Sequence, residues 1–281
     1  RQGDDHPVVY VNWDEAGAKD ISLAGNINPI PEVISRRPDW NKQGLGPCQT
    51  GVAGKDARMR FAPLGDAAIA VDFGLSPAGV APGRLHSLTR ALQQNPPPGA
   101  VDVVPAYGTV TVFYDDGEGS DFATRCAAIE SRGGLMVGAS DDVEVWVEIP
   151  VCYDAELAPD LARVAAQAQC AEAEVAALHA AGEYRVQAVG FSPGFPYLAG
   201  LPERLHTARL ATPRTAVPAG SVGIGGAQTG IYPLATPGGW NLIGRTPLRL
   251  FDLAANPPAR LRVGDRVRFK AITREEFAAW K

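Results

Sequence analysis

The hydrophobic residues of this chain follow two periods, one typical of helices and one typical of strands. A period of three to four residues predicts helices at about 82–94, 121–132, 159–167 and 171–181. Alternation predicts a strand over 143–149, with Glu144, Trp146 and Glu148 on one face and aliphatic residues on the other. Further strands are expected at 8–11, 101–104, 109–114, 184–189 and 247–252, with pairs of strands within 59–73 and 261–271. This mixture of helices and strands indicates an α+β protein.

Neither period survives in the stretch from Gly190 to Pro247. Glycine and proline occur at almost every turn of it, and it begins GFSPGFPYLAGLPERL. Proline fixes φ and lacks a backbone donor, while glycine adopts conformations closed to other residues. We therefore expect short strands joined by shaped loops, and such loops on a rigid scaffold often carry binding or catalysis.

The pattern divides the chain into three parts. Residues 1–57 hold one predicted strand among prolines and glycines, and they show no recognisable chemistry. This N-terminal extension is compatible with disorder or with packing against a partner. Residues 58–140 predict a small α+β domain of two helices among several strands. Residues 141–281 are mostly strands with a helical hairpin, which is compatible with a closed barrel, although periodicity alone does not establish closure.

The composition and net charge limit the kinds of ligand, partner and cellular compartment that we expect for this protein. The 281 residues are 46% hydrophobic, which is ordinary for a soluble globular protein, and the net charge of −5 argues against nucleic acid. No apolar run reaches the length of a membrane span, and the start lacks a signal-peptide pattern, so we expect a cytoplasmic protein. The four cysteines and four histidines are scattered, which predicts reduced thiols and no metal site built by this chain.

Two familiar motifs are present only in appearance. Gly190 to Gly194 matches the G-x-S-x-G nucleophile elbow, but that elbow needs the N–H after the serine and a helix behind it. Pro193 has no N–H, and Gly194 and Pro196 oppose a helix, so Ser192 is not expected to be a nucleophile. Residues 220–230 are rich in glycine but contain no lysine, which excludes a phosphate-binding P-loop.

The charges of the 190–247 stretch predict a site for a small anion. It contains four arginines, a single acid and no lysine, and the guanidinium fork fits carboxylate or phosphate. The candidate substrate-binding residues are Arg209, Arg214, Ser221, Gln228, Tyr232 and Trp240.

Each candidate also has a structural interpretation. Arg209 and Arg214 suit a carboxylate clamp, but a surface pair is equally compatible with the sequence. Gln228 and Tyr232 suit the orientation of a carbonyl or amide, and the alternative is hydrogen bonds that hold the loop. For Ser221 and Trp240 the alternatives are a turn cap and a core side chain. No catalytic residue stands out, because His206 suits a surface position and His179 suits the end of a helix.

Five segments in this order also carry a family resemblance. They are GFSPGFPYL at 190–198, TPR at 212–214, VPAGSV at 217–222, QTGIYP at 228–233, and PGGW at 237–240 followed by IGRTP at 243–247. Shorter segments at 61–66, 103–107, 174–185 and 264–269 agree with them. The chain, over roughly residues 58–281, resembles the family of KipI, the B subunit of 5-oxoprolinase (PxpB) and allophanate hydrolase subunit 1. Residues 1–57 have no counterpart in this resemblance.

The resemblance implies a small α+β domain followed by a cyclophilin-like β-barrel. It implies a heteromer with a C subunit, which is similar to allophanate hydrolase subunit 2 and KipA, and an enzyme completed by an A subunit. The implied activity is the ATP-dependent opening of 5-oxoproline to glutamate. Whether this chain or a partner binds the ATP is left open.

Two other functions within the same family stay open at this point. One branch inhibits a histidine kinase, and related domains form part of the carboxyltransferase of biotin-dependent urea carboxylase. The second would need biotin carrier and carboxylase partners, which this chain does not contain.

Overall fold

The computed structural model describes residues 9–12, 20–23, 59–73, 82–115, 121–133 and 146–280. The chain divides into two compact units, Arg1–Pro47 and Cys48–Lys281. In the first unit, strands β1 (Val9–Asn12) and β2 (Asp20–Leu23) form an antiparallel pair. The strand expected at 8–11 is therefore confirmed as β1. The boundaries expected near residues 57 and 140 stay predictions.

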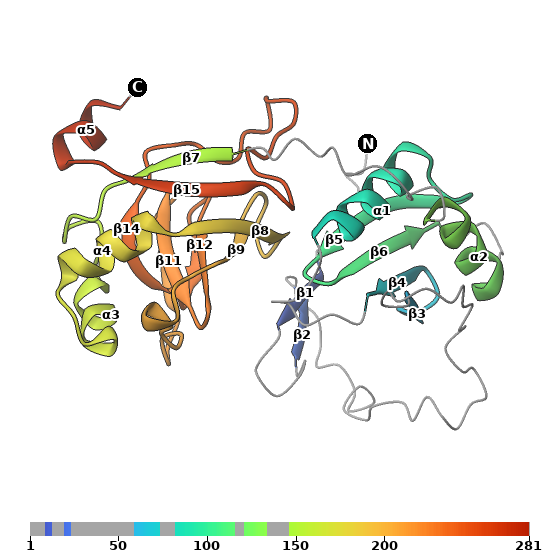
Figure 1. The fold of residues 1–281 in the computed structure, drawn as a ribbon, viewed down its shortest axis with the longest axis horizontal. Helices are drawn as coiled ribbons and strands as arrows, with labels where there is room; N and C mark the ends of the chain where they lie inside the picture. Colours follow the sequence, from blue (N-terminus) through green and yellow to red (C-terminus); the bar gives the residue numbers. More distant parts are fainter. Residues whose placement is uncertain are drawn as a thin grey trace. The chain divides into compact units, whose positions relative to one another are not determined.

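The small α+β part begins with β3 (Arg60–Pro63) and β4 (Ala68–Asp72) and continues through α1 (Pro82–Gln94), β5 (Ala100–Ala106), β6 (Thr109–Tyr114) and α2 (Phe122–Gly133). Its four strands form an antiparallel sheet in the order β3-β4-β6-β5 (Figure 1). Leu85, Leu88 and Leu92 of α1 are buried with Ile129 of α2 against this sheet. The leucine spacing that predicted α1 is thus the face that the helix buries.

The second sheet contains seven strands and is strongly curled. Its strands are β7 (Trp146–Val151), β8 (Glu183–Val189), β9 (Pro196–Ala199), β11 (Ser221–Gly225), β12 (Gln228–Ile231), β14 (Asn241–Arg245) and β15 (Arg266–Ala271). They lie in the order β14-β11-β12-β9-β8-β15-β7, and only β15 and β7 run parallel. The two edge strands meet where Cys152 and Arg245 exchange two backbone hydrogen bonds of 2.9 Å. The sheet therefore curls until its edges touch at one point.

Helices and a small ribbon complete this part of the chain. The hairpin of α3 (Leu161–Ala168) and α4 (Glu172–Ala181) packs on the sheet, and Val164 and Val175 are fully buried in the main core (Figure 1). A 3-10 turn, η3 (Glu203–Leu205), lies beside α3. Strands β10 (Arg214–Val217) and β13 (Thr236–Gly238) form a separate two-stranded ribbon. The α+β class predicted from the sequence is confirmed.

Three local predictions need correction. The strand expected at 247–252 does not form; the segment makes one bridge, between Phe251 and Ala259, and otherwise packs as a loop. The first arm of the hairpin expected in 261–271 is also a turn, because the Arg262 N–H donates to the Asp265 carboxylate. A last helix, α5 (Arg274–Ala279), was missed. Of the strand expected at 143–149, residues 143–145 lie outside the described residues.

Candidate functional site

Four aromatic rings gather on the outer face of the curled sheet. Phe195 lies at the centre, with its ring 4.9 Å from that of Tyr197, 5.1 Å from Tyr232 and 5.4 Å from Trp240. All three contacts are edge-to-face, the arrangement that aromatic quadrupoles favour. We call Phe195, Tyr197, Tyr232 and Trp240 the aromatic cluster. Phe191 extends it at the rim, where its side chain is 40% exposed.

The glycines of β11 and β12 make room for the Trp240 indole. A Cβ on Gly225 would stand 2.5 Å from Cε2 of the indole, and one on Gly230 would stand 3.0 Å from Cζ3. A Cβ on Gly223 would meet the Trp240 Cβ at 3.1 Å. The glycine-rich sequence therefore accommodates a tryptophan ring and is part of a strand pair. This is the physical meaning of a pattern that only superficially resembles a phosphate-binding loop.

Two of the predicted site residues are part of this packing. Trp240 is 5% exposed and Tyr232 is 1% exposed. The Tyr232 hydroxyl accepts a hydrogen bond from the Trp240 backbone N–H and lies against Gly238, where a Cβ would collide with it. Burial raises the pKa of Tyr232. Both residues therefore build the wall of the candidate site, as a core tryptophan and a loop-holding tyrosine would.

Arg214 is neutralised by a residue that the sequence interpretation missed. Its Nη2 donates to Asp160 Oδ1 at 2.7 Å, and the other carboxylate oxygen of Asp160 accepts from the Leu242 N–H at 2.7 Å. Asp160 is nearly buried and directly precedes α3. The pair thus joins the helical hairpin to β10 and β14. Asp160 lies outside the glycine- and proline-rich stretch, so sequence proximity gave no signal for it.

Arg209, unlike Arg214, has no counter-ion among the described residues. Its backbone is fixed on both sides, because Thr207 and Gly226 exchange two hydrogen bonds and the Leu210 N–H donates to the Gly239 carbonyl. Asn241 Nδ2 also donates to the Ala208 carbonyl at 3.0 Å. The exposed guanidinium stands 5.8 Å from the centre of the Trp240 ring. It has no hydrogen bond or ion pair with any described residue. A rigid loop therefore presents an unpaired cation over an aromatic wall.

Tyr197 is a second unpaired donor beside that cation. The hydroxyls of Tyr153, Tyr184 and Tyr232 all have protein partners. The Tyr197 hydroxyl has none among the residues that the structure describes. Burial raises the pKa of Tyr197 to about 12, and the nearby Arg209 lowers it only in part. Tyr197 was not among the residues predicted from the sequence.

The remaining predicted residues occupy supporting positions. Ser221 begins β11 and is 2% exposed; its backbone N–H donates to the Pro218 carbonyl. Gln228 begins β12 and is half-buried opposite Gly225. Ser192 lies in a turn closed by the Phe195 N–H, and Gly194 has a φ of +78°. Strand β9 follows that turn, so the absence of a nucleophile elbow at Ser192 is confirmed.

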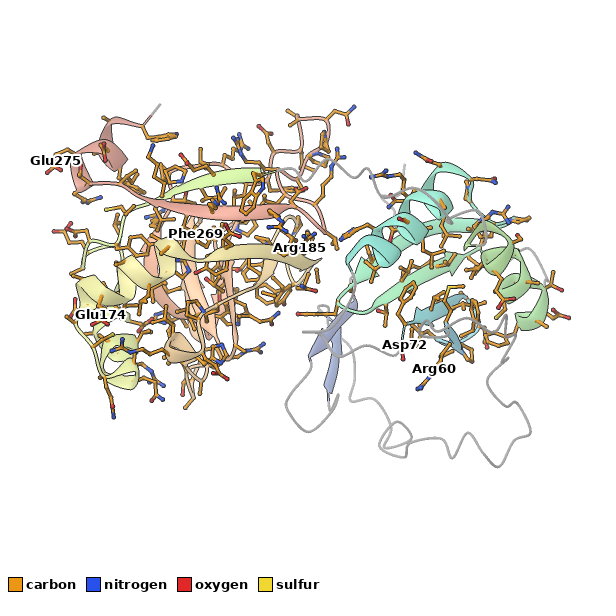
Figure 2. The ribbon with its side chains drawn as sticks, in the orientation of Figure 1. Arg60, Asp72, Glu174, Arg185, Phe269 and Glu275 are labelled. Carbon is orange, nitrogen blue, oxygen red and sulfur yellow. The ribbon has the colours of Figure 1, made fainter. Side chains whose placement is uncertain are left out.

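His179 is a buried structural residue on the inner face of the sheet. Thr229 donates to the Gly223 carbonyl, so His179 Nε2–H donates to Thr229 Oγ1 at 3.0 Å and Nδ1 accepts from the Tyr153 hydroxyl at 2.8 Å. The imidazole stacks on Phe269, which Figure 2 labels, at 4.4 Å between ring centres. Burial lowers the pKa of His179 to about 3. The ring is therefore neutral and fully hydrogen-bonded, which does not fit a general base.

Two further observations concern metal binding and membrane spans among the described residues. They hold no group of three or more His, Cys, Asp or Glu side chains placed to bind a metal ion. No helix among them is long and apolar enough to cross a membrane. His206, the other histidine considered from the sequence, is half-buried with Nε2 3.2 Å from the Leu201 carbonyl.

The small α+β part and the curled sheet together match one domain class. Residues 59–261 match the family model of the carboxyltransferase domain, subdomain C and D. The chain belongs to this family. It is 42% identical over 236 residues to the B subunit of 5-oxoprolinase from Bacillus subtilis, a match that covers 80% of this chain and 97% of the relative. It is 50% identical over 174 residues to the B subunit of 5-oxoprolinase from Escherichia coli O157:H7, covering 61% and 78%.

Two solved structures share the fold of this chain. The crystal structure of TTHA0988 is 40% identical, has a TM-score of 0.63 and aligns with 73% of this chain. This chain spans only 40% of TTHA0988, whereas it spans nearly the whole Bacillus relative. The urea carboxylase of Kluyveromyces lactis has a TM-score of 0.62 over 82% of this chain and 23% of its own length. At 19% identity, that likeness shows a shared fold alone.

Proposed function

We propose that this chain is the B subunit of an ATP-dependent 5-oxoprolinase, which opens 5-oxoproline to glutamate. The observation that carries the proposal is the 42% identity to a 5-oxoprolinase B subunit over nearly that protein's entire length. An arginine without a counter-ion beside aromatic rings adds chemical support, because the substrate is a small ring that carries a carboxylate.

The reaction divides into steps that a complex can share. ATP transfers its γ-phosphoryl group to the lactam oxygen, which gives ADP and an activated ring. Water adds at the ring carbonyl carbon, the C–N bond breaks, and the nitrogen takes the proton that becomes part of the amine. Hydrolysis of the resulting acyl phosphate by a further water gives phosphate and glutamate.

We assign the substrate carboxylate to Arg209 rather than to Arg214. Arg214 already donates to Asp160, and drawing it away would leave a nearly buried carboxylate unpaired. Arg209 has no such partner and stands on a fixed loop, so no existing bond is lost when it binds an anion. Arg214 then acts as a positioning residue for β10. Gln228, half-buried beside Gly230, orients the lactam, while Tyr232, Trp240 and Ser221 form the wall and its turn.

ATP does not fit the glycine-rich segment of this chain. A phosphate cradle needs free backbone N–H groups and open space, but Gly223 and Gly230 face each other in the β11–β12 ladder and lie under the Trp240 indole. We therefore assign the binding of ATP to a partner protein. This division implies a heteromer with a C subunit, similar to allophanate hydrolase subunit 2, together with an A subunit.

The proposal also covers the fold of the second domain and the cellular compartment in which the protein works. The contact of both sheet edges at Cys152 and Arg245 supports a cyclophilin-like barrel for the second domain. The curled sheet with an inner apolar core is the expected form of such a barrel. We also propose that the protein works in the cytoplasm, where Cys126, Cys152 and Cys170, which form no disulfide in the described part of the chain, remain thiols.

Reconstitution tests the function. The chain is co-purified with the C subunit, the A subunit is added, and ADP and glutamate are measured from 5-oxoproline. We expect glutamate only when all three proteins are present. A stable complex that forms no glutamate would overturn the proposal and direct the search to urea-type amides or to inhibition of a histidine kinase.

Two variants test the role of Arg209. Replacing a charged hydrogen bond costs about 1.5–3 kcal/mol, so Arg209→Gln should raise KM for 5-oxoproline roughly ten- to hundredfold. Arg163→Gln, an equivalent change on the exposed face of α3, should leave KM unchanged. Equal KM values for the two variants would show that Arg209 does not hold the carboxylate.

A further inference from the structure

The site over the aromatic cluster contains two hydrogen-bond donors that the protein itself does not use. The Arg209 guanidinium lies 5.8 Å from the centre of the Trp240 ring, and the Tyr197 ring centre also lies 5.8 Å from it. Both groups therefore border the same indole ring, and the positive charge of Arg209 lowers the pKa of the Tyr197 hydroxyl against the larger effect of burial. Neither group has a hydrogen-bond partner among the described residues.

We propose that Tyr197 is a substrate-binding residue, whose hydroxyl donates to one carboxylate oxygen of the substrate while Arg209 binds the other. The ligand class is a compact cyclic monocarboxylate, with the half-buried Tyr197 ring and the exposed Phe191 ring as its apolar contacts. This inference rests on the proposed function, since it names a second recognition residue for the same substrate.

The chemistry of the pair favours a carboxylate over a neutral group. A carboxylate accepts several hydrogen bonds and matches the fork of a guanidinium. A tyrosine hydroxyl, which is protonated near neutral pH even at its ordinary pKa, donates to such an anion without adding charge. One cation with one neutral donor therefore balances a single negative charge. A ligand without the carboxylate would leave both donors without an acceptor.

The other tyrosines of the curled-sheet domain show that an unused hydroxyl is exceptional there. The Tyr184 hydroxyl donates to the His179 carbonyl at 2.7 Å, and the Tyr153 hydroxyl is 2.8 Å from His179 Nδ1. The Tyr232 hydroxyl accepts from the Trp240 backbone. Tyr197 lies in β9 and packs with Tyr232 in the aromatic cluster. Its hydroxyl, however, forms no hydrogen bond with any of the described residues. Its ring serves the fold, whereas its hydroxyl is available to a ligand.

The test uses Tyr197→Phe, which removes the hydroxyl and preserves the ring. Tyr114→Phe is the matched control, because the Tyr114 hydroxyl is buried without a partner in the small sheet. Binding to the co-purified complex is measured by calorimetry with three probes. They are 5-oxoproline, 2-pyrrolidinone (the same lactam without the carboxylate) and cyclopentanecarboxylate (the carboxylate without the lactam).

We expect Tyr197→Phe to weaken binding of both carboxylates about tenfold, as for loss of one charged hydrogen bond, and to leave 2-pyrrolidinone unchanged. In turnover, KM should rise by a similar factor while kcat stays within about twofold, because the contact forms in both ground and transition states. Tyr114→Phe should alter neither quantity. Parental affinity for both carboxylates in Tyr197→Phe would overturn the proposal, as would an equal loss for all three probes.

The design separates this inference from the proposed function. If the complex hydrolyses 5-oxoproline but Tyr197→Phe has parental KM, the function stands and the role of Tyr197 fails. If no hydrolysis occurs but both carboxylates bind in a Tyr197-dependent way, the carboxylate site stands and the function fails. Unchanged thermal unfolding of Tyr197→Phe shows that any loss of binding is not a loss of folding.

Discussion

Asp160 and Arg214 are 54 residues apart in the chain, yet their side chains form an ion pair of 2.7 Å. Asp160 also accepts from the Leu242 N–H, so one carboxylate ties the start of α3 to the ribbon and to β14. The arginine that looked like half of a substrate clamp is therefore part of the frame. The Asp160–Arg214 pair thereby supports the strands that flank Trp240, the ring beside which the unpaired Arg209 lies.

Breaking this pair should lower stability more than breaking a surface pair. Asp160→Asn leaves the half-buried Arg214 charge without its counter-ion, so we expect a loss of about 1–3 kcal/mol in the free energy of unfolding. Glu156→Gln removes an exposed partner of Arg274 and should cost less than about 1 kcal/mol. Denaturant unfolding measures both. Equal losses would contradict a framework role for Asp160.

Gly225→Ala should disturb the aromatic cluster directly. The added methyl would stand 2.5 Å from the Trp240 indole, a rigid ring that must move as a whole. Overpacking of this kind costs about 1–3 kcal/mol, and the tryptophan fluorescence should change with it. Gly190→Ala is the control, because no atom lies within 4 Å of a Cβ there. A Gly225→Ala protein with parental stability and emission would show that the indole has room.

His179 should make the protein less stable in mild acid. Its pKa of about 3 in the folded chain lies below the ordinary value of 6.5, so between these values the unfolded chain binds a proton that the folded chain does not. Stability is therefore unaffected above about pH 6.5 and falls below it, by roughly 2 kcal/mol from pH 7 to 5. His179→Gln should show a shallower decline over this range. Identical slopes for parent and His179→Gln would refute the assignment.

Asn241 should affect substrate affinity through the Arg209 loop. Its Nδ2 donates to the carbonyls of Ala208 and Ile224, so Asn241→Ala releases the residue next to Arg209. We expect a stability loss of about 1–3 kcal/mol and a higher KM for 5-oxoproline. Thr273→Ala removes the N-cap of α5 and should cost about 0.5–2 kcal/mol while KM stays constant. A parental KM in Asn241→Ala would show that the loop needs no such anchor.

The sequence predicted regular elements well where one face of an element is buried. Leu85, Leu88 and Leu92 identified α1, and all three are buried as the period required. It failed at 247–252, where Leu250 is buried but the chain has no strand partner beyond one bridge. Burial of apolar residues does not by itself specify a strand, because pairing needs a neighbour in register. The capping box of Thr273 and Glu276 was the readable signal for α5.

The glycine that ends α4 is required by side-chain packing and not by its backbone conformation. Gly182 is the C-cap of α4, and its φ of −70° is open to other residues. A Cβ there would instead collide with the Tyr184 ring. Gly223, Gly225 and Gly230 are also required by packing, because a Cβ at each position would contact Trp240, ten or more residues further along the chain.

The sequence by itself determined which segments form helices and strands, where the glycine- and proline-rich loops lie, and that arginines dominate the charge of those loops. Hydrophobic period, glycine content and charge are local properties of the chain. The tertiary structure alone decided which arginine is free. Asp160 neutralises Arg214 from a distant helix start, while the segments around Arg209 are pinned by backbone bonds that leave its side chain unpaired. It also decided that Tyr197 keeps an unused hydroxyl. Counter-ions and hydrogen-bond partners are set by which segments the fold brings together, and spacing along one sequence does not contain that information.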